Sequence, residues 1–128
     1  MTDPDFPEAL RAFIRDYIPN VDAAELLFLF ARAHAKPLDL AAALDGLRPA
    51  VISPAAARRH LEAFAGRGLL ARLGDDTYEY QPASADLDKL VRALTRVYNE
   101  RPVTLVRTIY ALRDETIRSF ADAFRIKK

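Results

Sequence analysis

The stretch SPAAARRHLEAFAGRGLLARLGDDTYEYQP, residues 53–82, decides the fold of this chain. It begins with Ser53, a residue type that caps helix N-termini, and Pro54, which suits the first helical position. A helix is therefore predicted over 53–66. Its apolar positions share one face, as in a helix packed against a core: Ala57, Leu61, Phe64 and Ala65. Its charged positions are expected to face outward: Arg58, Arg59 and Glu62.

A β-hairpin is predicted directly after this helix. The glycines in 66–68 end the helix, and residues 69–73 and 77–81 are rich in the branched and aromatic side chains that favour strands. Between them, the Gly-Asp-Asp sequence at 74–76 has the composition of a tight turn. Pro82 closes the second strand, because proline has no N–H to donate to a strand ladder.

Two helices are predicted before this stretch. Residues 21–34 carry apolar side chains on more than one face, which is typical of a helix at the centre of a core. A proline-containing break at 36–38 ends that helix. Asp39 is suited to cap a short helix that runs through Leu44. The link 45–52 then leads to the next helix.

Further helices are predicted at both ends of the chain. Residues 6–18 show the apolar stripe of an amphipathic helix, which Asp5 can cap. Residues 85–99 show the same helical spacing. Pro102 can begin another helix, and a separate last helix is predicted over 115–124. The segment 85–128 thus reads as a helical extension.

The order of a helix, a short helix, a capped helix and a glycine-terminated hairpin resembles the winged helix-turn-helix superfamily of bacterial transcriptional regulators, with a module of the MarR, PadR and ArsR type. The resemblance is carried by the following residues after the Ser-Pro start: Arg59-His60-Leu61, Phe64, Gly68-Leu69-Leu70 and Arg72. It implies a mostly α fold with a small β-hairpin wing, in which a winged helix-turn-helix core at 21–82 has additional N- and C-terminal helices. The recognition helix would be 53–66 and the wing 69–81, with its tip at 73–77.

The resemblance also implies a DNA-binding face. An α-helix fits the major groove of DNA, where its N-terminal side chains meet base edges. The residues assigned to this face are Ser53 and Arg72 as phosphate donors and Ala55, Ala56, Arg58 and Arg59 as groups that meet DNA. Arg58 or Arg59 would read guanine bidentately. The proposed wing tip carries Asp75 and Asp76, whose charge repels a phosphate backbone.

The length and composition of the chain limit the number of domains and the classes of protein that it can belong to. The 128 residues fit a single domain, 1–128, and 51% hydrophobic with 29% charged residues can fill a core and coat a surface. The chain has no cysteine, no apolar run that could span a membrane and no signal-peptide pattern, so a cytoplasmic protein is expected. The net charge is only +1, but residues 53–72 carry four arginines against one glutamate, and residues 101–128 carry seven bases against three acids. Such segregation can steer a polyanion.

Catalysis and metal binding are not expected. The chain has no cysteine nucleophile, no glycine-rich phosphate loop and no Gly-x-Ser-x-Gly elbow. Its two histidines, His34 and His60, are isolated from each other and from any matched carboxylate. No enzyme activity, metal or cofactor is therefore predicted.

The sequence favours a transcriptional regulator that binds double-stranded DNA, as a homodimer formed through its terminal helices. An alternative from another class stays open, because the charge is near neutral, the wing tip is acidic and the terminal helices are apolar. In that alternative, the winged-helix module binds a partner protein, for example through 85–128. A third possibility is a regulator gated by a small molecule between the core and the terminal helices.

Overall fold

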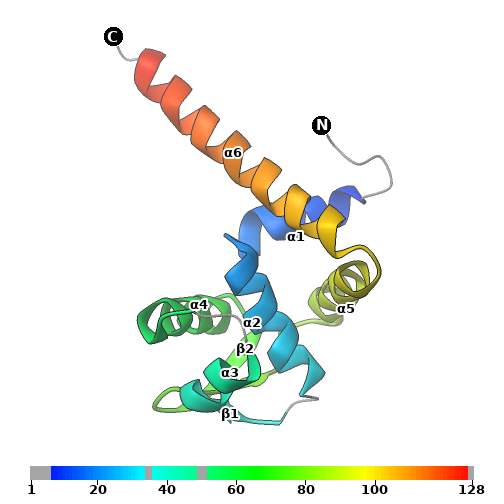
Figure 1. Cartoon of the computed structure of the whole chain (residues 1–128), viewed down its shortest axis with the longest axis vertical. Coiled ribbons are helices and arrows are strands. Elements are labelled where there is room, and N and C mark those ends of the chain that lie inside the picture. The colour runs from blue at the N-terminus through cyan, green and yellow to red at the C-terminus, as the bar shows by residue number, and fades with distance from the viewer. Residues whose placement is uncertain (1–6, 34–35, 49–51, 127–128) are drawn as a thin grey trace.

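The computed structural model describes residues 7–33, 36–48 and 52–126, with side chains up to residue 114. The elements are α1 (Glu8–Tyr17), α2 (Val21–Arg32), β1 (Leu38–Asp39), α3 (Leu40–Gly46), α4 (Pro54–Gly66), β2 (Leu70–Gly74), β3 (Thr77–Tyr80), α5 (Ala85–Glu100) and α6 (Pro102–Ile126). The small antiparallel sheet lies beside α2, α3 and α4, and the end of α6 leads away from the rest of the molecule (Figure 1). The prediction of a mostly helical chain with a small β element is confirmed.

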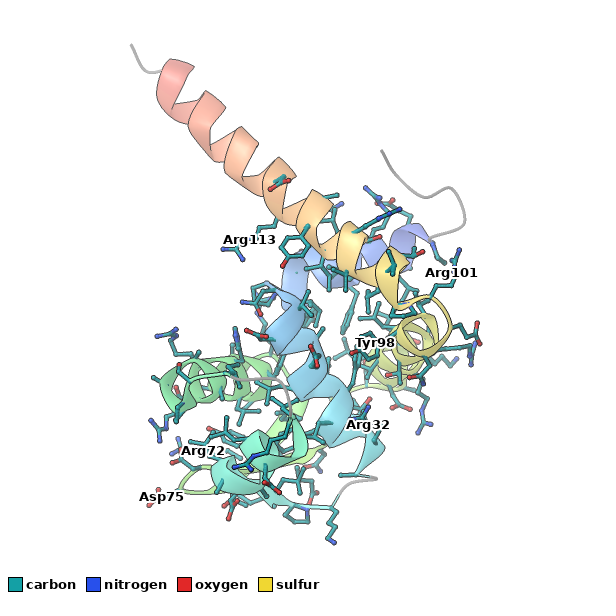
Figure 2. All side chains as sticks on the ribbon, in the orientation of Figure 1. Arg32, Arg72, Asp75, Tyr98, Arg101 and Arg113 are labelled. Atoms are coloured by element: carbon teal, nitrogen blue, oxygen red, sulfur yellow. The ribbon has the colours of Figure 1, made fainter. Side chains whose placement is uncertain are left out.

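Helix α2 lies at the centre of the structure. The Asn20 side chain caps it by accepting a 2.9 Å hydrogen bond from the Ala23 amide. Its fully buried side chains point in several directions around the helix: Ala23, Ala24, Leu26, Leu27, Phe28 and Phe30. Helices α3, α4 and α5 and strand β3 all contact it. On the α5 side, the rings of Phe28 and Tyr98 lie 5.1 Å apart, and Figure 2 shows Tyr98 between the two helices. The predicted central helix is therefore confirmed.

Helix α4 begins and packs as its sequence predicts. The Ser53 hydroxyl accepts a 3.1 Å hydrogen bond from the Ala56 amide, and Pro54 occupies the first helical position. Ala57, Leu61 and Phe64 are buried, whereas the charged residues of the helix are exposed. The capping residue of α3 is also confirmed, since the Asp39 carboxylate accepts from the Ala42 amide at 2.8 Å.

The end of α4 is fixed by a left-handed glycine. Gly68 has φ +83°, and its N–H reaches the carbonyl of Ala65 while the Leu69 N–H reaches the carbonyl of Phe64. These two bonds form the C-terminal arrangement that glycine favours. A Cβ at Gly68 would lie 3.1 Å from the Cβ of Ala83, so space as well as φ selects glycine here. The turn directs the chain from α4 into the sheet.

The sheet has three strands in the order β1-β3-β2, all antiparallel. The sequence predicted the hairpin of β2 and β3 but missed β1, whose Leu38 pairs with Tyr78. A two-residue strand is too short to produce an alternating pattern, and Pro37 beside it suggested only a helix break. The hairpin is also irregular, because its register shifts between Arg72 and Gly74. Such a bulge increases the local twist next to the turn.

The terminal helices pack together on one side of α2. Helix α1 contacts both α5 and α6, and the Ser84 hydroxyl caps α5 by accepting from the Leu87 amide at 3.1 Å.

The predicted boundaries of the terminal helices differ from those of the structure. The expected start of the first helix, with Asp5 as its cap, lies outside the described residues. The expected boundary before 115 is wrong, because α6 is continuous from Pro102 to Ile126 and this segment contains no glycine or internal proline to end it.

No helix of the described ranges is long and apolar enough to cross a membrane.

The hydroxyl groups of the two tyrosines on β3 differ in their hydrogen bonding. Tyr78 is 1% exposed, and its hydroxyl has no hydrogen-bond partner within the described part of the chain. The Tyr80 hydroxyl donates a 2.7 Å hydrogen bond to Asp88, which also accepts from Arg92 at 2.7 Å. Burial, with the Asp88 contact, raises the pKa of Tyr80 well above its ordinary range. Tyr80 thus joins the sheet to α5.

Substituting each tyrosine by phenylalanine tests this difference. Tyr78→Phe should leave the free energy of unfolding unchanged or raise it by up to ~1 kcal/mol, because it removes a buried polar group without a partner. Tyr80→Phe should lower it by about 1 to 2 kcal/mol, because it removes a hydrogen bond to a carboxylate. Urea unfolding followed by circular dichroism measures both. A greater loss for Tyr78→Phe than for Tyr80→Phe would contradict this description.

Candidate nucleic-acid interface

The candidate face consists of the exposed side of α4 and the turn between β2 and β3. The residues predicted to bind DNA are exposed, except for half-buried Ala56: Ser53, Ala55, Arg58, Arg59 and Arg72. Figure 2 shows Arg72 and Asp75 at the outer end of the hairpin, next to α4. The fold therefore brings the predicted helix and the predicted turn together. We call this surface the α4–turn face.

Arg58 is held by the turn. Its Nε donates to Asp76 Oδ1 at 2.9 Å and its Nη2 to Asp76 Oδ2 at 3.0 Å, a bidentate pair across 18 residues of sequence. The hydrogen bonds to Arg58 lower the pKa of the Asp76 carboxyl, and Asp76 in return raises the pKa of Arg58. Asp76 has φ +55°, a left-handed conformation that aspartate tolerates in turns. In this pair the Arg58 guanidinium fixes the turn against α4, and two of its five N–H donors are occupied by Asp76.

Arg72 has looser contacts. Its Nε donates to the carbonyl of Gly74 at 3.3 Å, and its Nη2 lies 3.9 Å from the Asp75 carboxylate. The side chain of Arg72 is 54% exposed, and that of Asp75 is fully exposed. Exposed pairs of this kind contribute little stability and are readily exchanged for other partners. Arg72 can therefore turn toward a phosphate.

Arg59 is the free cation of the face. It is exposed, and among the described residues it takes part in no hydrogen bond or ion pair. Its neighbour His60 is half-buried, and burial lowers the pKa of its imidazole, which favours the neutral form. Arg59 therefore supplies the unpaired positive charge at the centre of α4.

The Arg67 side chain does not belong to the α4–turn face, because it contacts α1. Its guanidinium donates to the carbonyl of Asp16 and lies 5.2 Å from the ring centroid of Tyr17. It thereby ties the end of α4 to α1. The sequence grouped Arg67 with the other arginines of 53–72, and only the tertiary contact shows that its charge is used within the molecule.

An open cleft of about 1250 Å³ lies at the end of β3 opposite the turn. Its walls come from the end of α2, the link after β3 and one side of α5, and its lining includes Arg32, Tyr80, Ser84, Arg92 and Arg96. Figure 2 shows Arg32 on α2. The cleft lies between α2 and the C-terminal helix α5. The sequence analysis named a small-molecule site between the core and the terminal helices as a third possibility.

The described residues hold no group of three or more histidines, cysteines or acids that could bind a metal ion. His34 lies outside those residues, and His60 has Asp22 of α2 as its one acidic neighbour among the causes of its pKa shift, with Arg59 as the opposing charge.

Comparisons with protein-family models, with characterised proteins and with solved structures gave no match. The function of the α4–turn face is therefore inferred from the chemistry of its own residues.

The pair of Arg58 and Asp76 can be tested by its pH dependence. Because the folded pKa of Asp76 is depressed, the contact is present above the ordinary aspartate range and is lost as the pH falls through the lowered value. Arg58→Ala should move the titration midpoint of the Asp76 carboxyl carbon upward, as measured by NMR. Arg59→Ala is the matched control and should leave this midpoint in place. An Asp76 midpoint that is equal in both variants would contradict the pairing.

Proposed function

We propose that this chain is a cytoplasmic transcriptional regulator of the winged helix-turn-helix type, which binds double-stranded DNA through the α4–turn face. In this proposal α4 is the recognition helix and the hairpin of β2 and β3 is the wing. The order of elements supports it, because α2, β1, α3 and α4 precede a hairpin that joins β1 in one sheet. Helix α3 also packs against α4, as the first helix of a helix-turn-helix packs against the second.

The observation that carries the proposal is the outward side of α4. Apart from its charged residues it has small side chains, with Ala55, Ala63 and Gly66 all exposed. A helix with so little bulk can approach the floor of a major groove about 12 Å wide. Arg59 stands in the middle of this side and has no partner among the described residues, so its donors are available to a base or a phosphate. Ser53, at the N-terminal end, adds a hydroxyl.

The turn supports this geometry by its fixed position. The bidentate contact of Arg58 with Asp76 holds the turn beside α4, so the two can contact DNA as one rigid surface. A surface that is ordered before binding loses less conformational entropy on association. Arg58 acts here as a positioning residue for the wing.

The charge of the face sets the expected strength of binding. Three arginines face three carboxylates: Arg58, Arg59 and Arg72 against Glu62, Asp75 and Asp76. The charge of Arg58 is neutralised by Asp76, so Arg59 and Arg72 are the arginines expected to contact phosphates. With about two phosphate contacts per face, the logarithm of the affinity should fall with the logarithm of the salt concentration with a slope near −2.

The role of Arg59 is tested by Arg59→Ala in a fluorescence anisotropy titration with duplex DNA selected from random sequence. The loss should be about 1 to 3 kcal/mol if Arg59 reads a base, and the salt slope should become shallower by about 1 if it binds a phosphate. Arg96→Ala removes an exposed arginine from α5 and is the matched control, with affinity unchanged. Equal affinities for both variants and the parent chain would exclude Arg59 from the contact.

The acidic turn gives a test in the opposite direction. Asp75 is fully exposed and its carboxylate is bound only loosely by Arg72, so its repulsion of phosphate should limit affinity. Asp75→Lys should therefore bind DNA several-fold more tightly at low salt, with a difference that shrinks as salt increases. Glu100→Lys makes the same charge change at the end of α5 and should have no such effect. An unchanged affinity for Asp75→Lys would place the turn away from the DNA.

A protein partner is the second candidate, and the equal number of arginines and carboxylates on the α4–turn face favours it. A mixed-charge surface suits a complementary protein better than a polyanion. In this case neither the parent chain nor Asp75→Lys would bind duplex DNA, even at low salt. The partner would bind the parent chain with a defined stoichiometry, and Arg59→Glu would weaken that binding while Arg96→Glu would not.

A further inference from the structure

The cleft between α2 and α5 is a long groove. Positions 85, 88, 92, 96 and 100 of α5 line it, and they follow one another by steps of three or four residues, so they lie on one face of the helix. They extend from the first residue of α5, Ala85, to the last, Glu100. At a rise of about 1.5 Å per residue, this face is roughly 22 Å long. We call this cleft the α5 groove.

The walls of the α5 groove carry few large apolar side chains. The wall opposite α5 is made by the end of α2 and the link after β3. The apolar members of the described lining, apart from Tyr80, are small or of medium size: Ala31, Pro82, Ala83, Ala85 and Val91. An amphipathic helix docks by laying its apolar face into a hydrophobic groove, which this lining does not provide. The backbone of an extended segment can come close to such small side chains.

Two arginines on opposite walls of the α5 groove are available to a ligand. Arg32 is exposed at the end of α2, on the side toward α5 (Figure 2), and Arg96 is exposed on α5. Within the described part of the chain, neither takes part in a hydrogen bond or an ion pair. A guanidinium binds a carboxylate through two parallel N–H donors. The groove therefore offers two positions for carboxylates.

The third arginine of the α5 groove is neutralised by a carboxylate of the same helix. Asp88 accepts one hydrogen bond from Arg92 and one from the Tyr80 hydroxyl, each at 2.7 Å, so both of its oxygens are bonded. Glu100 is the other acid of the described lining. The charge left over is therefore positive, with Arg32 and Arg96 against Glu100.

Other kinds of occupant fit the α5 groove less well. Its volume of about 1250 Å³ is above the ~300 to 1000 Å³ of typical small-molecule sites. The phosphates of a nucleic-acid strand would meet Asp88 and Glu100, and single strands stack their bases on aromatic side chains. Tyr80 is the one aromatic residue of the described lining, and it is only 9% exposed. A mixed-charge lining without a stacking surface suits a protein segment.

We propose that the α5 groove binds an extended acidic segment of a partner protein, whose carboxylates pair with Arg32 and Arg96. An extended chain advances about 3.3 Å per residue, so about seven residues fill the groove. Successive side chains of an extended segment point to opposite sides. Acids at neighbouring positions can therefore reach Arg32 on one wall and Arg96 on the other. The α5 groove lies at the end of β3 opposite the turn, so this proposal does not depend on the proposed DNA binding.

Selection from a displayed library of random heptapeptides, with the full chain as the target, tests the chemistry of the occupant. The selected sequences should be enriched in aspartate and glutamate. A fluorescein-labelled synthetic peptide of the most enriched sequence should bind more weakly as salt is added, and more weakly still when its acids are replaced by amides. Selected peptides without an excess of acids would overturn the proposal. Displacement of the peptide by an equal concentration of oligothymidylate would also overturn it, in favour of single-stranded nucleic acid.

The place of binding is tested with the same labelled peptide. Arg32→Glu and Arg96→Glu should each raise its dissociation constant roughly 3- to 10-fold, because each replaces an exposed ion pair by repulsion. Lys89→Glu is the matched control, since Lys89 is exposed on α5 but does not line the groove, and its dissociation constant should equal that of the parent chain. Amide NMR signals of residues 80–100 should shift on binding. Unchanged affinities for Arg32→Glu and Arg96→Glu, or an equal loss for Lys89→Glu, would overturn the assignment.

Discussion

The direction in which the chain leaves α4 depends on the left-handed turn at Gly68. From this residue the Leu69 amide returns to the carbonyl of Phe64, and the carbonyl of Gly68 accepts from the Ala83 amide at 2.7 Å. The first bond ends the helix, and the second holds the link after β3 beside the start of β2. The hairpin is therefore attached to the end of α4 at both its beginning and its end. Since a side chain at Gly68 would meet Ala83, the α4–turn face depends on this one glycine.

Two adjacent arginines on α4 serve different purposes. Arg58 binds Asp76 through two hydrogen bonds and fixes the turn, whereas Arg59 makes no hydrogen bond or ion pair within the described part of the chain. The same carboxylate that orients the turn also cancels one of the positive charges of the face. The geometry thus gains order and loses electrostatic attraction for a polyanion. We therefore expect the proposed DNA contact to depend strongly on Arg59 and on the charge of Asp75.

The sequence predicted the parts of the fold that local chemistry determines. Ser53 and Asp39 cap the helices that they were expected to cap, and the apolar surround of α2 correctly indicated a central helix. Contacts between residues far apart in the sequence could not be predicted, because the spacing of apolar residues indicates helices and strands but not which side chains meet in the folded chain. The pairing of Leu38 with Tyr78, the ion pair across the α4–turn face and the capture of Arg67 by α1 are of this kind. The structure brings the helix and the turn of the predicted face together on one surface, while the different contacts of its arginines could be seen only in the tertiary structure.

The central claim is that the α4–turn face contacts duplex DNA. The most direct measurement is a titration of the isotope-labelled chain with duplex DNA selected from random sequence, followed through its backbone amide NMR signals. The account predicts that the largest shifts fall in residues 53–63 and 74–77, with α5 unaffected on its exposed side. Shifts that are confined to the cleft between β3 and α5, or to α6, would contradict it, as would an unchanged spectrum at low salt.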